Sequence, residues 1–156
     1  MLFRSIVRSP GGVSSAYGLT ILAQAPAIFY SGSAGTQTRM ATVIRDDNLQ
    51  LVDFTNPIHP NLGITIYLTG MGTTTPLPAL GAPAPLDPLA LVDAPPTVTL
   101  GTVSLAVNFA GLTPGEIGVY QINALVPAEV QAGTNVPLII AQGGSSTSLS
   151  VRVVTP

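Results

Sequence analysis

Apolar and polar residues alternate along several segments of this chain with a period of two residues. Ile64, Ile66 and Leu68, for example, alternate with Thr65, Tyr67 and Thr69. Because successive side chains of a β-strand point to opposite faces of a sheet, this period predicts strands with one buried face. The same alternation occurs in three further segments, at residues 103–109, 120–126 and 149–153.

Turn residues separate these segments. Asp46-Asp47-Asn48 lies between residues 40–45 and 49–54, which predicts a hairpin whose turn residues tolerate positive φ, and Gly143-Gly144 predicts a second hairpin turn. The 16 Gly and 15 Pro occur too often for long helices. We expect at most one helical turn, near Asp87 to Val92. The pattern as a whole predicts an all-β fold, an immunoglobulin-like antiparallel β-sandwich.

One stretch, residues 73–96, carries seven prolines and should run extended, close to polyproline II. A loop of this length inside a compact domain is uncommon and often functional. We interpret the stretch as a long crossover between two sheets, with an interaction arm as the alternative.

The two ends of the chain share a sequence pattern at an offset of 132 residues, the distance from Gly11 to Gly143. Residues 6–12 align without a gap on residues 138–144. The match continues with Tyr17, Leu19 and Ile21, which fall on Leu149, Val151 and Val153. Both ends are therefore predicted to form the same β-hairpin, so that the sandwich has an additional N-terminal hairpin.

A two-stranded hairpin buries too little apolar area to be stable alone in water. Residues 1–24 are therefore interpreted as the terminal hairpin of a preceding repeat or as a donor segment, and residues 25–156 as the sandwich domain with its crossover at 73–96. The hairpin either folds back on its own domain or adds strands to a neighbouring molecule. Repeated head to tail, the second arrangement gives a filament, whereas a truncated tandem array is the alternative. The hypothetical assembly interface comprises Ile6, Val7, Tyr17, Leu19, Ile21, Leu149, Val151 and Val153.

The composition narrows the classes of partner. Hydrophobic residues make up 46% of the chain, charged residues only 8%, and Lys is absent, so the surface relies on hydroxyl and amide groups and is inclined to associate. The net charge of −2 gives no field that would attract nucleic acid. No apolar run approaches the roughly 18 residues of a membrane-spanning helix, so no membrane insertion is expected. The absence of Cys leaves the redox compartment open.

Residues with catalytic or metal-binding chemistry are few. His59 is the single histidine and lies between two prolines, where a turn residue is commoner than a general base. Asp46, Asp47 and Asn48 offer too few oxygen atoms to enclose Ca²⁺. The remaining acids are isolated in the sequence: Asp53, Asp87, Asp93, Glu116 and Glu129. We therefore predict no enzyme activity, no catalytic residues, no cofactor and no metal.

Aromatic residues make up only 5% of the chain, which makes a sugar-binding surface the weaker interpretation. Exposed aromatic rings usually form the platforms on which sugars stack. Tyr67 and Tyr120 lie in predicted strands, where packing in the core is the commoner role. Carbohydrate binding therefore stays the alternative function.

A set of short motifs also resembles a known family. Leu112-Thr113-Pro114-Gly115, followed by Tyr120-Gln121-Ile122-Asn123 and Val126-Pro127, is the most specific part. Further matching pieces are Ala25 to Phe29, Asn56-Pro57, Ile66 to Gly72, Ala110-Gly111, Gly118-Val119 and Ala128. Together they resemble the Solibacter-type uncharacterised C-terminal domain of large secreted bacterial proteins. The resemblance implies a β-sandwich related to TIG-like immunoglobulin folds, and export; it supplies no catalytic residues.

These observations lead to one functional expectation. We expect a non-catalytic extracellular or cell-surface module that self-assembles through β-strand or hairpin addition into a homopolymeric filament or a surface array. The alternative is a carbohydrate-binding or adhesive module of a larger secreted protein.

Overall fold

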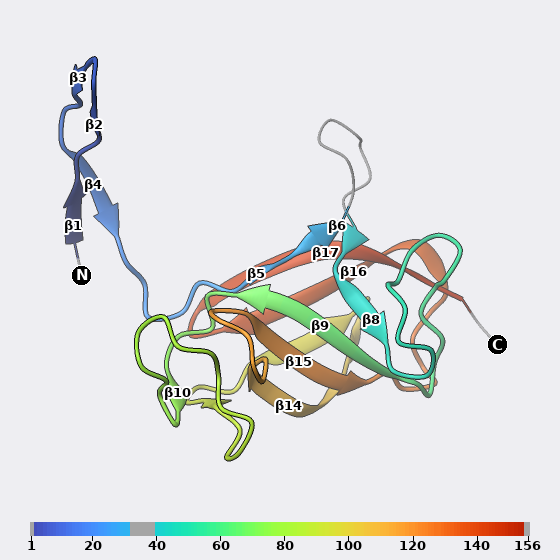
Figure 1. The fold of residues 1–156 in the computed structure, drawn as a ribbon. Coiled ribbons are helices and arrows are strands. Elements are labelled where there is room, and N and C mark those ends of the chain that lie inside the picture. Colours follow the sequence, from blue (N-terminus) through green and yellow to red (C-terminus); the bar gives the residue numbers. More distant parts are fainter. Residues whose placement is uncertain (1, 32–39, 155–156) are drawn as a thin grey trace.

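The computed structural model describes residues 2–31 and 40–154, and within these residues the secondary structure consists of strands alone (Figure 1). Most strands belong to two sheets that pack face to face, and a separate hairpin precedes them. The predicted all-β sandwich with an additional N-terminal hairpin is therefore confirmed.

The first sheet contains seven strands in the order β10-β11-β14-β15-β9-β5, and β8 also pairs with β9. Their bounds are β5 (Ala27–Ile28), β8 (Val43–Arg45), β9 (Gly63–Thr69), β10 (Thr74–Thr75), β11 (Leu91–Val92), β14 (Ala106–Leu112) and β15 (Tyr120–Leu125). The second sheet has six strands in the order β13-β12-β16-β17-β7-β6. These are β6 (Tyr30–Ser31), β7 (Met40–Ala41), β12 (Thr97–Leu100), β13 (Val103–Ser104), β16 (Gly133–Gln142) and β17 (Ser145–Val153).

The core lies between the inner faces of the two sheets. In β9 the side chains of Ile64, Ile66 and Leu68 are fully buried, as their alternation predicts. Ile66 pairs with Ile122 of β15, so that the buried faces of neighbouring strands are in register. Burial of one such side chain contributes about 1.5–3 kcal/mol, and rows of them hold the sheets together.

The two predicted hairpin turns have different outcomes. Gly143 and Gly144 connect β16 to β17 with φ of 56° and 82°, the conformation that a two-residue hairpin turn needs. The turn after β8 is also present, but its positive φ of 56° lies at Leu49 and not at Asp46, Asp47 or Asn48. The reason is that the Leu49 amide donates to the Arg45 carbonyl, so the three polar residues form a helix-like turn that ends at Leu49.

The alternating segment from Val103 to Phe109 is not one strand. Its first part forms β13 in the second sheet and its later part forms β14 in the first sheet. The chain crosses between the sheets at Leu105, whose side chain is buried and whose amide donates to the Val98 carbonyl. Both sheets turn their inner faces to the same core, so the alternation continues through the crossing and conceals it.

The proline-rich stretch forms a long loop between two strands of the first sheet and then a short crossover to the second sheet. Strands β10 and β11 pair with each other, residues 76–90 form the loop between them, and residues 93–96 lead to β12 in the other sheet. At Asp87 to Val92, where the sequence allowed at most one helical turn, the structure has none. Leu91 and Val92 are strand residues, because Leu91 lies between Thr75 of β10 and Gly111 of β14 and takes part in both pairings.

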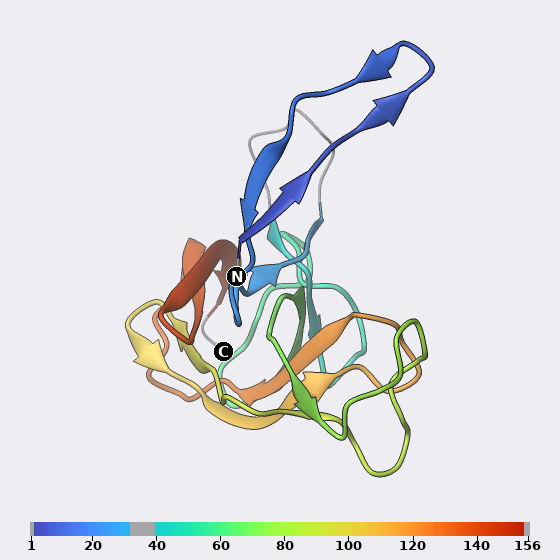
Figure 2. The same cartoon turned by 90° about the vertical axis from the view of Figure 1, so that its left-hand side faces the viewer.

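The N-terminal hairpin stands away from the sandwich (Figures 1 and 2). It consists of β1 (Leu2–Ser5), β2 (Arg8–Ser9), β3 (Gly12–Val13) and β4 (Tyr17–Thr20), with β1 paired to β4 and β2 to β3. Its turn is Pro10-Gly11, because Ser9 pairs with Gly12. The turn therefore lies one residue earlier than the alignment with Gly143-Gly144 predicts, and Pro10 suits that first turn position because its ring fixes φ near −65°.

Candidate assembly surface

The hairpin carries apolar side chains that its own two strands leave in solvent. Seven of them are between 45% and 71% exposed: Ile6, Val7, Val13, Tyr17, Leu19, Ile21 and Leu22. Five of these belong to the interface hypothesis drawn from the sequence. A concentration of exposed apolar groups on one element is characteristic of an interaction site, since single scattered residues are the norm elsewhere.

Strand alternation sorts the residues of β4 onto two faces. Tyr17 and Leu19 share one face, and Gly18 and Thr20 lie on the other. Beyond β1 and β4 the ladder shifts, because Ser5 pairs with Tyr17 whereas the Val7 carbonyl accepts from the Ser14 amide. Within the part of the chain that the structure describes, no third strand pairs with either edge of this hairpin.

The root of the hairpin is fixed to one end of the sandwich. The Ala25 amide donates to the Gly70 carbonyl over 2.8 Å, and the Ser145 hydroxyl donates to the Gln24 carbonyl over 3.1 Å. Gly70 and Gly72 have φ of 79° and 83°, and a Cβ atom on them would lie 2.1 Å from the Ala25 carbonyl oxygen and 2.7 Å from that of Ala23. The chain therefore approaches the sandwich closely here because these two residues are glycine.

The three C-terminal residues of the interface hypothesis lie elsewhere. Val151 and Val153 are buried in the core of their own sandwich, and Leu149 is half-buried against it. Their side chains are therefore occupied within the chain, because β17 turns this face inward. The structure does not bring them together with the exposed hairpin residues.

A second exposed apolar surface was not predicted from the sequence. It is formed by Leu77, Leu80, Leu86, Leu89 and Ile117, which are between 42% and fully exposed, and we call it the loop surface. The loop that carries four of them is held to the β14–β15 connection by hydrogen bonds from the Ala84 amide to the Glu116 carbonyl and from the Gly115 amide to the Ala84 carbonyl. A shallow groove of about 220 Å³ runs between the two segments. The sequence signal was the presence of four leucines among the prolines, without the alternation that would bury them.

Polar side chains of the turn after β8 are engaged with one another. Asp47 forms an ion pair with Arg45, Asp46 accepts a hydrogen bond from Thr65, and Asn48 donates to Asn56. The hydrogen bonds from Arg45 hold the pKa of Asp47 below its ordinary value. Among the described residues no three His, Cys, Asp or Glu side chains are grouped so that they could hold a metal ion.

The other acids named from the sequence are not gathered into one site. Asp53 closes a local turn by accepting from the amides of Thr55 and Asn56 and from the Thr55 hydroxyl, which lowers its pKa. Asp93 accepts from the Thr75 hydroxyl beside β10, and hydrogen bonds from Thr73 and Thr75 lower its pKa. These carboxylates stabilise turns and strand ends.

The two strand tyrosines do not form a platform for sugars. Tyr120 is half-buried, and its hydroxyl donates to the Gly72 carbonyl, so the ring lies between β15 and the end of β9. Burial raises its pKa. Tyr67 is also half-buried within β9. A sugar ring stacks on an exposed aromatic face, which neither residue offers in full.

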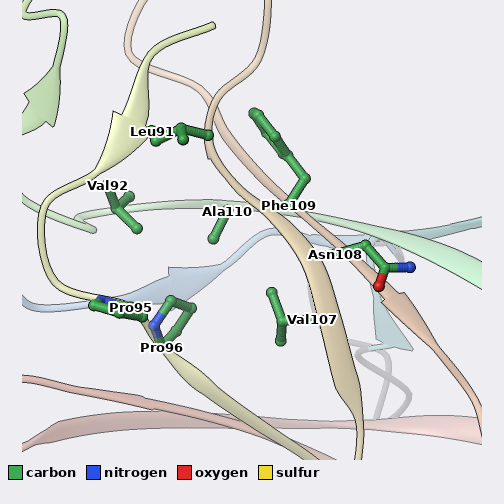
Figure 3. A pocket seen from close by; sticks show the side chains of 8 residues that line it. All are labelled: Leu91, Val92, Pro95, Pro96, Val107, Asn108, Phe109 and Ala110. Carbon is green, nitrogen blue, oxygen red and sulfur yellow. The ribbon is translucent and has the colours of Figure 1, made fainter.

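An apolar groove lies beside β11 and β14 (Figure 3). Leu91 and Val92 of β11, Pro95 and Pro96 of the crossover, and Val107, Asn108, Phe109 and Ala110 of β14 line it. Its volume of about 260 Å³ is below the range of roughly 300–1,000 Å³ of small-molecule sites. The Asn108 side chain points away from the others, and no titratable group lines the groove, so it has no acid–base chemistry to offer.

Comparisons of the chain with family models, with curated proteins and with solved structures found no match. The resemblance to the Solibacter-type domain therefore stays a prediction. No helix in the described residues is long and apolar enough to cross a membrane.

Proposed function

We propose that this chain is a non-catalytic structural module that joins to further copies of itself through its N-terminal hairpin, and that the joined copies form an extracellular filament or a cell-surface array. The observation that carries the proposal is the hairpin itself, which stands off the sandwich with seven apolar side chains in solvent.

The physical argument starts from the cost of leaving such an element uncovered. Two strands bury too little apolar area to be stable in water, and within the described residues no further strand pairs with the outer edges of β1 and β4. Docking on another β-sandwich would remove the apolar side chains from water at about 25 cal/mol per Å² and could pair the free edges. The sandwich of the same chain leaves the hairpin side chains exposed. A second copy of the chain is a partner that is present in every solution of the protein.

The arrangement of the contact favours an open polymer. The hairpin is one surface and its acceptor is another, so the contact is heterologous, and its repetition from copy to copy gives a chain unless the rotation closes. A chain with only 8% charged residues and no Lys opposes such association weakly. The extracellular location rests on the family resemblance alone.

The proposal predicts that one substitution in the hairpin abolishes polymers. In sedimentation velocity and negative-stain electron microscopy the unmodified chain should form large species that increase with concentration. Leu19→Lys should shift it to monomers, because the ammonium group would be buried on the docking face. Thr20→Lys is the matched control, since the same charge stands on the opposite face of β4.

Circular dichroism should show that both variants keep the sandwich, because neither position contacts it. Monomers of the unmodified chain at every concentration would overturn the proposal. The proposal would also be overturned if Leu19→Lys formed polymers of the same size and amount as the unmodified chain. A closed dimer of the unmodified chain would contradict the filament.

A further inference from the structure

The loop surface lies at the same end of the sandwich from which the hairpin departs. Strand β9 ends there at Thr69, and the following residues Gly70 and Gly72 hold the root of the hairpin. The loop at 76–90 and the β14–β15 connection are close by in sequence and in space, because Leu112 and Tyr120 pair where the two strands meet. Figure 2 looks onto this end and shows the hairpin rising away from these loops.

The hairpin of the same chain leaves the loop surface in solvent. Leu77 and Leu86 are 72% and 74% exposed, and Leu80 is fully exposed. The fixed root directs the hairpin away, since residues 23–25 are held against Gly70 and Gly72. Two apolar surfaces of one chain therefore stand uncovered at the same time.

The charges of these two surfaces are opposite. Residues 1–24 contain Arg4 and Arg8 and no acid, so the hairpin carries +2. The remaining residues contain three Arg and seven Asp or Glu, so they carry −4, in agreement with the net −2 of the chain. The loop at 76–90 and the connection at 113–119 contain Asp87 and Glu116 and no Lys or Arg. Complementary charges around an apolar contact favour encounter and orientation of two partners.

We infer that the loop surface of one copy is the acceptor for the hairpin of a second copy. The inference rests on the proposed function and adds the acceptor to it. The apolar face with Tyr17 and Leu19 covers Leu77, Leu80 and Ile117, and the groove between the loop and the β14–β15 connection receives a large side chain of the hairpin. The net charge of +2 on the hairpin favours its approach to the acidic loop surface, although Arg4 itself, which pairs with Gly18, lies on the face opposite Tyr17 and Leu19.

Chemical cross-linking between two populations of chains tests this contact. The chain has no Cys, so single cysteines can be placed at will. One population, labelled with ¹⁵N, carries Leu19→Cys, and the other carries Leu80→Cys. The mixture is treated with a short flexible bismaleimide, and mass spectrometry identifies cross-links between a labelled and an unlabelled chain. The control population carries Leu49→Cys, whose site is also exposed, at 78%, but lies in the turn after β8 at the opposite end of the sandwich.

We expect about tenfold or more cross-linking of Leu19→Cys with Leu80→Cys than with Leu49→Cys, because docking gives the two thiols a high effective concentration. Equal cross-linking to both sites, or a preference for Leu49→Cys, would overturn the inference. Sedimentation of the same samples separates two failures. Polymers without the Leu80 preference would refute only this acceptor, whereas monomers without cross-links would refute the proposed function as well.

Discussion

Replacing Gly70 by alanine is expected to lower the free energy of unfolding by about 3 kcal/mol or more. The φ of 79° is strained for any residue with a Cβ atom, and that atom would lie 2.1 Å from the Ala25 carbonyl oxygen. This neighbour is backbone, held by the hydrogen bond from the Ala25 amide to the Gly70 carbonyl, and cannot rotate away. The root of the hairpin would therefore have to leave the sandwich.

Gly144→Ala separates the two contributions to this loss of stability, which are the backbone strain at positive φ and the steric clash of the new Cβ atom. Gly144 has a similar φ of 82°, but no atom lies within 4 Å of the position of its Cβ. Its replacement should cost only the backbone strain, about 1–2 kcal/mol. Denaturant unfolding should be measured in the Leu19→Lys background so that association does not add to apparent stability. If Gly70→Ala is no less stable than Gly144→Ala, the close approach of the root is refuted.

Gln142→Glu is expected to destabilise the sandwich by about 3 kcal/mol at neutral pH. Gln142 is 4% exposed, and its Nε2 donates to the carbonyl oxygens of Met71 and Ala94 over 3.1 and 2.6 Å. It thereby joins the end of β16 to the segment after β9 and to the crossover that leads to β12. A carboxylate in this place has no donor and faces two acceptors.

The loss of stability caused by Gln142→Glu should increase as the pH rises. Burial beside two carbonyl oxygens would raise the pKa of the new carboxyl group in the folded state, so the folded protein holds its proton more tightly than the unfolded chain does. Stability should be largely recovered below the pKa of the unfolded glutamate and lost as the pH rises through the raised folded value. Gln142→Leu, which has no titrating group, should show a deficit that is nearly constant over this range. Denaturant unfolding at several pH values distinguishes the two, and a pH-independent deficit of Gln142→Glu would contradict the assignment.

The strands that pack against a single core were predictable from local alternation. Ile64, Ile66 and Leu68 indicated β9 correctly, because one face of that strand is fully buried along its whole length. Gly143-Gly144 indicated its turn correctly, because few other residues adopt two successive positive φ angles.

Where the sequence interpretation failed, a distant contact determined the outcome. The crossing at Leu105 was concealed because both sheets bury the same alternate positions. The strand at Leu91 and Val92 was not indicated, because Leu91 pairs with two strands that approach it from other parts of the chain. Neither partner is visible in the local pattern.

The candidate assembly surface was predictable in part. The repeat at the two ends of the chain indicated the hairpin and its apolar residues, because that pattern lies within a short stretch of sequence. The burial of Val151 and Val153 follows from the pairing of β17 within its own sheet. The loop surface and the contacts of Gly70 with the hairpin root depend on tertiary approach, which residue patterns do not specify.

The central claim is that the hairpin is covered by a sandwich other than its own, and amide hydrogen exchange at several protein concentrations tests it most directly. In dilute solution the amides of residues 2–20 should exchange rapidly while those of β9 and β15 stay protected. At concentrations where larger species form, the hairpin amides should become protected, and Leu19→Lys should prevent this change. Hairpin amides that exchange at one unprotected rate at all concentrations, or that are already protected in the isolated monomer, would contradict the account.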